Sequence, residues 1–443
     1  MTKLHKIIKR IIGVSFIDTV YKLLTFHDFF IAASPRILRH KVSKVRKLQL
    51  QKIEQVRHQD KCTVLFFIQT PSIWKYDAIY HKLETSEYFE PLLVVSPYNV
   101  HLIYDQKECF KIMKQTEKFA QEKGFNYTSA YDWGKRKWKD IKKIYHPDIV
   151  FFTKPYKDTL PAYHIYNFLD ALTMYIPYGI NCMTTFYNNY ELPFHSLLWK
   201  YLLETEFQKH YAEQYEKSKG DNVEVVGALA LEDLMRLDYI PQDVWKKQEK
   251  RKKRIIWAPH HTVDYLFNFS NFLNYSENML QLAEKYQEEV QFAFKPHPVL
   301  KFKLLNLWGE KKTEEYYNRW ANLSNAQIEQ GDYIDLFKTS DAMIHDCGSF
   351  TVEYLYTKKP VLFQIRDEKV KDEFNTFGQL CFEKHYHAYT IEETETFIRD
   401  IVINGNDPKA DEREQFYMQY LYPKDGVMPS DKIYTILKTL IGK

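Results

Sequence analysis

The chain has 443 residues, a length that favours two domains over a single hydrophobic core. Of these residues 45% are hydrophobic and 27% charged, a composition that excludes a disordered or fibrous protein. The formal net charge of +4 is concentrated in residues 1–60, which hold 13 Lys and Arg against 4 Asp and Glu. Without a basic folded body or a nucleic-acid motif, we expect no nucleic-acid partner. Five scattered cysteines without a CxxC pair indicate a reducing cytoplasm and no cysteine-based metal site.

The first predicted element is a basic helical extension over residues 1–58. At 100° per residue, the apolar side chains from Leu4 to Ile11 fall on one side of a helix and the intervening lysines on the other. Charged residues interrupt the apolar stretch 11–33, which argues against a membrane-spanning helix and against a signal peptide. We expect residues 1–50 to bind an anionic membrane surface, with an ordinary packing helix as the alternative.

Short apolar runs then alternate with amphipathic segments, which is typical of βαβ units and parallel sheets. The pattern predicts an N-terminal Rossmann-like domain over 59–222 and a C-terminal Rossmann-like domain over 223–429. Residues 430–443 are predicted as a C-terminal helix that can cross back to the first domain. The predicted strands are 63–68, 91–96, 148–152 and 174–177, then 255–258, 290–294, 342–345 and 360–364.

This fold class is α/β, with two doubly wound parallel-sheet domains that face a cleft, in which ligands bind at the carboxyl ends of the strands. One such strand end is the turn that starts at Asp346. Gly348 allows close backbone approach, Ser349 and Thr351 supply hydroxyls in a first helical turn, and the helix start favours a diphosphate. Glu353 lies one turn further along, where it can accept hydrogen bonds from ribose hydroxyls. The alternative is that Ser349 is a simple N-cap and Glu353 its charge complement.

Two further strand ends carry histidines. His297 stands between two prolines and can act as a general base or steady charge on a leaving diphosphate. His260 and His261 are adjacent and point to different sides of an extended chain, so we expect only one to face the cleft. Without a nearby carboxylate cluster at ligand spacing, no metal site is expected. In the first domain, Tyr178 lies in a turn that either receives the acceptor or simply ends a strand.

Residues 333–355 with 359–363 resemble the signature of the CDP-glycerol glycerophosphotransferases, the teichoic-acid and capsule polymerases of bacteria, and 256–262 and 295–298 follow that family's order. The resemblance implies a GT-B fold, a CDP-linked donor that serves as substrate without a further cofactor, and a cytoplasmic protein that is peripheral on the inner face of the cell membrane. The catalytic residues are predicted to be His297, His261 and Tyr178. The donor-binding residues are predicted to be His260, Thr262, Lys295, Asp346, Gly348, Ser349, Phe350, Thr351 and Glu353.

The chain departs from the family pattern at three places. The usual Asp-Tyr-Ser-Ser reads Asp346-Cys347-Gly348-Ser349, which removes one hydroxyl. Pro177-Tyr178-Gly179 stands where a Trp-His-Gly motif is usual, and Ala258-Pro259-His260 replaces Ala-Pro-Thr. The family's histidine in the first domain is therefore missing.

The predicted reaction is transfer of glycerol phosphate, or a related polyol phosphate, from CDP-glycerol to a lipid-linked glycan or polyol-phosphate acceptor in cell-surface polysaccharide synthesis. The alternatives are a GT-B glycosyltransferase that uses a CMP- or UDP-sugar, a nucleotide-sugar epimerase, and a membrane-associated scaffold that has lost its chemistry.

Overall fold

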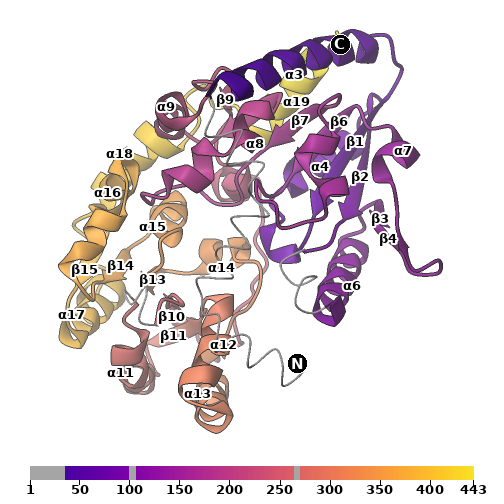
Figure 1. The fold of residues 1–443 in the computed structure, drawn as a ribbon. Coiled ribbons are helices and arrows are strands. Elements are labelled where there is room, and N and C mark those ends of the chain that lie inside the picture. The colour runs from indigo at the N-terminus through magenta and orange to yellow at the C-terminus, as the bar shows by residue number, and fades with distance from the viewer. Residues whose placement is uncertain (1–34, 99–105, 264–269) are drawn as a thin grey trace. The chain divides into compact units, whose positions relative to one another are not determined.

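The computed structural model describes residues 35–98, 106–263 and 270–443, which form two compact units (Figure 1). The first unit holds the described residues up to Tyr178 together with Thr185–Val226 and Ser430–Lys443. The second holds Gly179–Thr184 and Gly227–Pro429. Each unit is therefore built from separate stretches of chain. The short segment 179–184 packs with the second unit although it lies within residues assigned to the first domain by sequence.

The first unit contains a seven-stranded parallel sheet of order β3-β2-β1-β6-β7-β8-β9. Its central strands are apolar because flanking helices cover both faces. The strands are β1 Cys62–Ile68, β2 Phe89–Val95, β3 Tyr127–Ser129, β6 Ile149–Phe152, β7 Leu172–Tyr175, β8 Lys200–Leu203 and β9 Val223–Val225, with a small hairpin of β4 Tyr131–Asp132 and β5 Lys137–Trp138. The helices are α4 Asp77–Glu84, α6 Gln106–Glu122, α7 Ile141–Tyr145, α8 Pro193–Leu197 and α9 Glu206–Tyr215.

Two terminal helices complete the first unit. Helix α3 Pro35–Val56 buries Leu38 and Val45, and its Arg46 and Gln49 side chains donate hydrogen bonds to the carbonyls of Leu198 and Leu197. Helix α19 Pro429–Leu440 returns from the end of the chain, where its last carbonyl accepts a hydrogen bond from Arg57 Nε at 3.3 Å. The predicted amphipathic helix from Leu4 to Ile11 lies outside the described residues. Among those described, no helix is both long and apolar enough to span a bilayer.

The second unit contains a six-stranded parallel sheet of order β12-β11-β10-β13-β14-β15. Its strands are β10 Lys253–Ala258, β11 Val290–Phe294, β12 Ala326–Ile328, β13 Ala342–His345, β14 Val361–Gln364 and β15 Tyr386–Ala388. Its helices are α10 Glu232–Met235, α11 Phe272–Lys285, α12 Pro298–Leu307, α13 Glu310–Asn322, α14 Ile334–Thr339, α15 Phe350–Glu353, α16 Thr376–Phe382, α17 Ile391–Thr396 and α18 Ala410–Phe416. Trp257, Phe294 and Trp320 anchor its core, with ring centres 5.0 to 5.3 Å apart.

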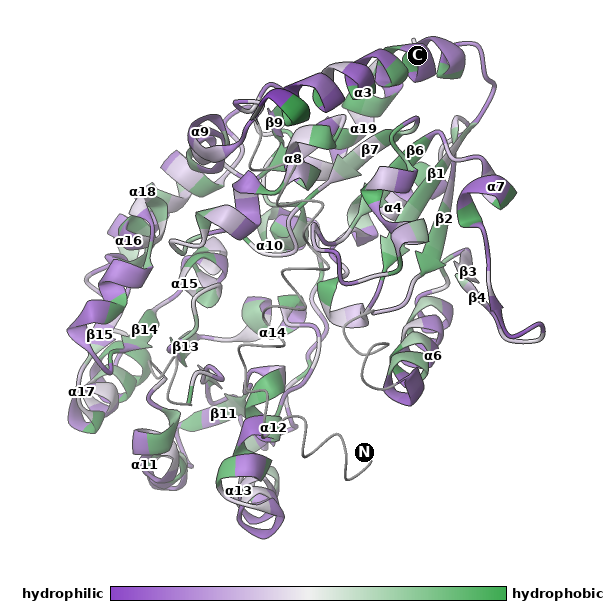
Figure 2. Ribbon diagram, viewed as in Figure 1, coloured by the Kyte–Doolittle hydropathy of each residue, from purple (hydrophilic) through white to green (hydrophobic). Residues whose placement is uncertain are grey.

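The two units confirm the predicted α/β class with doubly wound parallel sheets. Within each sheet the strands are hydrophobic, whereas the helices alternate hydrophobic and hydrophilic residues (Figure 2). This distribution is expected when both faces of a sheet are covered by amphipathic helices. The carboxyl ends of neighbouring parallel strands consequently lie along one edge, where polar turns can gather.

Candidate active site

Three polar turns follow three neighbouring strands of the second unit. In the order β11-β10-β13, Trp257 is paired with Phe294 and Ala258 with His345, so these strands end at nearly the same level. Strand β10 leads into His260 and His261, β11 into His297, and β13 into the turn that begins at Asp346. Motifs that are far apart in the sequence therefore share one edge of the sheet.

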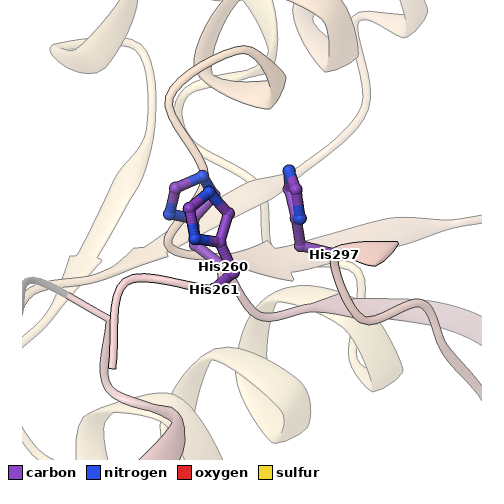
Figure 3. Close-up of side chains that lie close together, drawn as sticks. All are labelled: His260, His261 and His297. Carbon is purple, nitrogen blue, oxygen red and sulfur yellow. The ribbon is translucent and has the colours of Figure 1, made fainter. Parts of the chain in front are cut away.

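The side chains of His260, His261 and His297 form a cluster, which we call the histidine trio (Figure 3). The ring centres of His260 and His261 are 4.2 Å apart, those of His261 and His297 4.2 Å, and those of His260 and His297 5.0 Å. The expectation that His260 and His261 point to different sides is wrong. Side chains alternate only along extended chain, and β10 ends at Ala258, before the pair.

His260 and His297 are held in the neutral form. Burial, reinforced by repulsion from His261 and His297, lowers the pKa of His260 to about 2. Burial and repulsion from His261 lower the pKa of His297 to about 4. Neutral imidazoles offer a lone pair and an N–H at neutral pH, so each ring can accept one hydrogen bond and donate another.

His297 also caps helix α12. Its Nδ1 accepts a hydrogen bond from the backbone N–H of Val299 at 3.2 Å. An accepting Nδ1 in a neutral ring places the proton on Nε2. In this tautomer Nε2 is a hydrogen-bond donor, which suits stabilisation of negative charge on a phosphate oxygen better than removal of a proton.

Asp346 connects two of the turns from inside the protein. Its buried carboxylate accepts hydrogen bonds from the backbone N–H of His260 at 2.6 Å, the Ser270 hydroxyl at 2.7 Å and the backbone N–H of Asn271 at 2.7 Å. Burial raises the pKa of this carboxyl to about 6, although the three bonds act to lower it. Asp346, predicted to bind the donor, is thus a positioning residue for the turn that carries His260 and His261. Sequence reasoning missed Ser270 and Asn271 because nothing in their spacing connects them to Asp346.

The turn after β13 presents unused backbone donors. Among the described residues, the N–H groups of Gly348, Ser349 and Phe350 have no hydrogen-bond acceptor, and the first turn closes with the N–H of Thr351 on the Gly348 carbonyl at 3.2 Å. Ser349 is exposed, has helical dihedrals and makes no capping bond, so it is not the simple N-cap of the alternative reading. Three free amides at a helix start form an anion-binding feature.

Two residues of this turn differ from their expected roles. The Thr351 hydroxyl, expected to face a donor, is buried and donates to the Cys347 carbonyl at 3.0 Å. Gly348 was expected to admit a ligand, but a Cβ there would come within 3.2 Å of Met183 Sδ. The missing side chain of Gly348 makes room for the segment 179–184, whose Cys182 thiol donates to the Gly348 carbonyl at 3.1 Å.

Beside the turn, Glu353 is buried and hydrogen-bonded to Tyr333. Burial of Tyr333, together with the nearby Glu353 carboxylate, raises the pKa of the Tyr333 hydroxyl well above its usual value. Lys295 is also buried; its ammonium donates to the Gly331 carbonyl at 2.9 Å and lies 5.8 Å from the centre of the Tyr333 ring. Phe350 packs on the same ring at 5.5 Å. Tyr333 thus links three predicted donor-binding residues, a role that sequence reasoning missed.

Two predicted residues remain, one beside the trio and one in the first unit. Thr262 is buried, and its hydroxyl lies 3.1 Å from Nδ1 of His260, so it positions that ring. Tyr178, the predicted catalytic residue of the first domain, is 38% exposed and belongs to the first unit. Its role stays a prediction.

Comparison with known proteins identifies the second unit. Residues 246–438 match the family model of CDP-Glycerol:Poly(glycerophosphate) glycerophosphotransferase, a region that includes the trio and the Gly348 turn. The second unit is therefore similar to that family over most of its length. The match indicates a transferase, as the sequence signature did. No curated protein matches the chain in sequence.

Solved structures share the fold of this chain. The wall teichoic acid polymerase TagF is 12% identical, with 96% of this chain and 100% of that chain covered and a TM-score of 0.54. A putative UDP-N-acetylglucosamine 2-epimerase from Listeria monocytogenes is 15% identical over 86% of this chain and 96% of that chain, with a TM-score of 0.52. The Neisseria meningitidis enzyme of that type, bound to UDP-GlcNAc, is 14% identical over 86% and 100%, with a TM-score of 0.54. These likenesses establish the GT-B-type architecture and nothing about the substrate.

Proposed function

We propose that the chain transfers glycerol phosphate, or a related polyol phosphate, from CDP-glycerol to a growing polymer acceptor in teichoic-acid or capsule synthesis. The observation that carries the proposal is the set of three strand-end turns within the family-matched region, with free amides after β13 and neutral histidines after β10 and β11. Free amides at a helix start favour a diphosphate, the part of the donor that reacts.

In the proposed reaction, an acceptor hydroxyl oxygen attacks the phosphorus that carries glycerol. A new O–P bond forms, the P–O bond to CMP breaks, and CMP leaves with the electron pair while the hydroxyl proton passes to a base. The amides of Gly348, Ser349 and Phe350 hold the diphosphate, and the Nε2–H of His297 stabilises the charge that grows on the leaving phosphate. His261 is the nearest ring to His297 and takes the proton in this scheme.

Recognition of the nucleoside is assigned to the side chains around Tyr333. Glu353 accepts hydrogen bonds from ribose hydroxyls, and its contact with Tyr333 keeps the carboxylate in place. The exposed hydroxyl of Ser349 adds a polar contact at the start of the turn. The acceptor is proposed to be lipid-linked, with Tyr178 on the acceptor side.

The reaction is tested by incubating the full chain with CDP-glycerol, CDP-ribitol, CMP-sialic acid or UDP-sugars and measuring nucleotide release with and without a polyol-phosphate acceptor. We expect acceptor-dependent release of CMP from the CDP-linked donors. Conversion of a UDP-sugar without any acceptor would support an epimerase instead. Transfer of a sugar from a CMP- or UDP-sugar to the acceptor would support a glycosyltransferase. If calorimetry shows no binding of any nucleotide, the remaining hypothesis is a membrane-associated scaffold that has lost its chemistry.

Two variants of Ser349 isolate the role of the backbone in donor binding. The φ of −64° at this position suits proline, so Ser349→Pro removes one free N–H together with the hydroxyl, while Ser349→Ala removes only the hydroxyl. Calorimetry with CDP should show weaker binding for the proline variant than for the alanine variant. Equal affinities would contradict diphosphate binding by the amides.

We also propose a peripheral location at the inner face of the cell membrane through residues 1–50. The basic excess of residues 1–60 supports this, as do Arg36, Arg39 and Lys47 on the exposed side of helix α3. Full-length protein should co-sediment with anionic liposomes, and protein that begins at residue 51 should not. Equal co-sedimentation of the two proteins would contradict membrane binding through residues 1–50.

A further inference from the structure

We propose that the histidine trio binds a divalent transition-metal ion, with Zn²⁺ as the best match and one coordination position open to a ligand oxygen. His260, His261 and His297 each offer a nitrogen, and these atoms lie within 4.8 Å of one another (Figure 3). The sequence argued against a metal because no carboxylate cluster lies at ligand spacing near His260 and His261. The structure supplies a third ligand of another kind, the imidazole of His297.

The separation of the rings suits tetrahedral zinc. With Zn–N distances of about 2.0–2.1 Å, the centres of three ligating imidazoles lie about 5 Å apart. The observed separations of 4.2, 4.2 and 5.0 Å are no larger. The rings therefore need to turn so that their nitrogens face one point, but they do not need to approach each other.

His260 already has the supporting contacts of a metal ligand. Its Nδ1 lies 3.1 Å from the Thr262 hydroxyl, a contact that makes Nε2 the ligating nitrogen in this proposal, and its backbone N–H is fixed by the Asp346 carboxylate at 2.6 Å. Such outer contacts set the tautomer and orientation of ligating histidines and strengthen metal binding.

His297 must change one hydrogen bond on binding. Its Nδ1 accepts from Val299 N–H, so coordination through Nε2 requires the ring proton to move from Nε2 to Nδ1, and coordination through Nδ1 displaces the Val299 contact. The ring stays neutral in either case, and no proton is released. The loss of one capping bond is small beside the binding of a divalent ion by three imidazoles.

The ligand set determines which ion is bound. Among the described residues the cluster consists of nitrogen ligands alone. Imidazole suits Zn²⁺, Cu²⁺, Ni²⁺ and Co²⁺, whereas Mg²⁺ and Ca²⁺ require oxygen ligands. A site with three protein ligands keeps an open position, as catalytic zinc sites do. Binding of the metal does not depend on the proposed function. Its use does: at the open position the ion would polarise a phosphate oxygen of the donor in place of the His297 Nε2–H, and a base other than the ligating His261 would then take the acceptor's proton.

The test uses the full chain, stripped of metal with a chelator and titrated with Co²⁺ while its visible absorption is recorded. We expect one equivalent to bind with the intense d–d bands of four-coordinate cobalt, displacement of these bands by Zn²⁺, and no displacement by Mg²⁺. His261→Ala and His297→Asn should each weaken Co²⁺ binding at least tenfold. Asn can retain the cap of helix α12, so the second variant keeps the fold. His210→Ala, which removes an exposed imidazole in helix α9, is the control and should bind as the unaltered protein does.

The proposal is overturned if the titration shows no stoichiometric band, or if His261→Ala and His297→Asn bind Co²⁺ within twofold of the unaltered chain. An equal loss in His210→Ala would also overturn it. Calorimetry with CDP, run in the presence of chelator and again with Co²⁺, separates this proposal from the proposed function. Cobalt binding without CDP binding in either condition supports the metal site and contradicts the transferase reaction. CDP binding without cobalt binding supports the transferase reaction and contradicts the metal site.

Discussion

Replacing His297 with Ala is expected to lower the turnover of CDP-glycerol by about 10²-fold or more, the usual scale for a group that acts on protons or charge in the transition state. The neutral ring carries its proton on Nε2 because Nδ1 accepts the Val299 N–H. Without that donor, charge on the departing phosphate is left unstabilised. The measurement is the rate of CMP release at saturating donor and acceptor.

His297→Ala alone does not separate catalysis from folding, because the residue is also the N-cap of helix α12. Loss of such a cap costs about 1 kcal/mol. His297→Asn supplies an oxygen for the cap but lacks the imidazole, so it should unfold like the unaltered protein while remaining as slow as His297→Ala. His210→Ala is the surface control. A change in turnover below about threefold in a folded His297→Asn variant would exclude the ring from the mechanism.

Replacing Gly378 with Ala is expected to cause the largest loss of stability in the second unit. A Cβ at this position would lie 2.1 Å from the carbonyl oxygen of Cys182 and 3.0 Å from its carbonyl carbon, so backbone must move. The same oxygen accepts the backbone N–H of Asn375 at 2.9 Å. Overpacking together with a lost buried hydrogen bond amounts to about 3 kcal/mol or more.

The stability loss in Gly378→Ala is measured as a lower apparent melting temperature in calorimetry and as faster proteolysis near residues 179–184. The matched control is Gly348→Ala, whose new Cβ would meet the flexible Met183 side chain at 3.2 Å rather than backbone. The control should melt close to the unaltered protein. Equal melting of the two variants would mean that segment 179–184 is not held against Gly378 as the structure shows.

The placement of the three turns was predictable from sequence for a simple physical reason. Strands β10, β11 and β13 are continuous apolar runs, which is how strands buried on both faces appear, and parallel strands carry their polar turns at the same edge. The edge strands β12 and β15 were missed because each has only three residues, too few for an apolar run to be recognised.

The orientation of individual side chains was much less predictable. His260 and Asp346 are positioned by one another through a hydrogen bond that joins residues 86 apart in sequence. Thr351 turns inward because its hydroxyl satisfies a buried carbonyl, a local preference of threonine in helices that spacing alone does not reveal. Segment 179–184 adjoins the first domain in sequence, yet its packing is decided by contacts with Asn375 and Gly378.

The way the chain divides between its units has a consequence for synthesis on the ribosome. The second unit contains residues 179–184, which are made before the stretch 227–429 that completes it, and the first unit is finished only by Ser430–Lys443. Domains usually fold as they emerge, N-terminal first. Here residues 179–184 must wait for the stretch 227–429 and the first unit must wait for Ser430–Lys443, so neither unit can complete its folding from its N-terminal stretch alone.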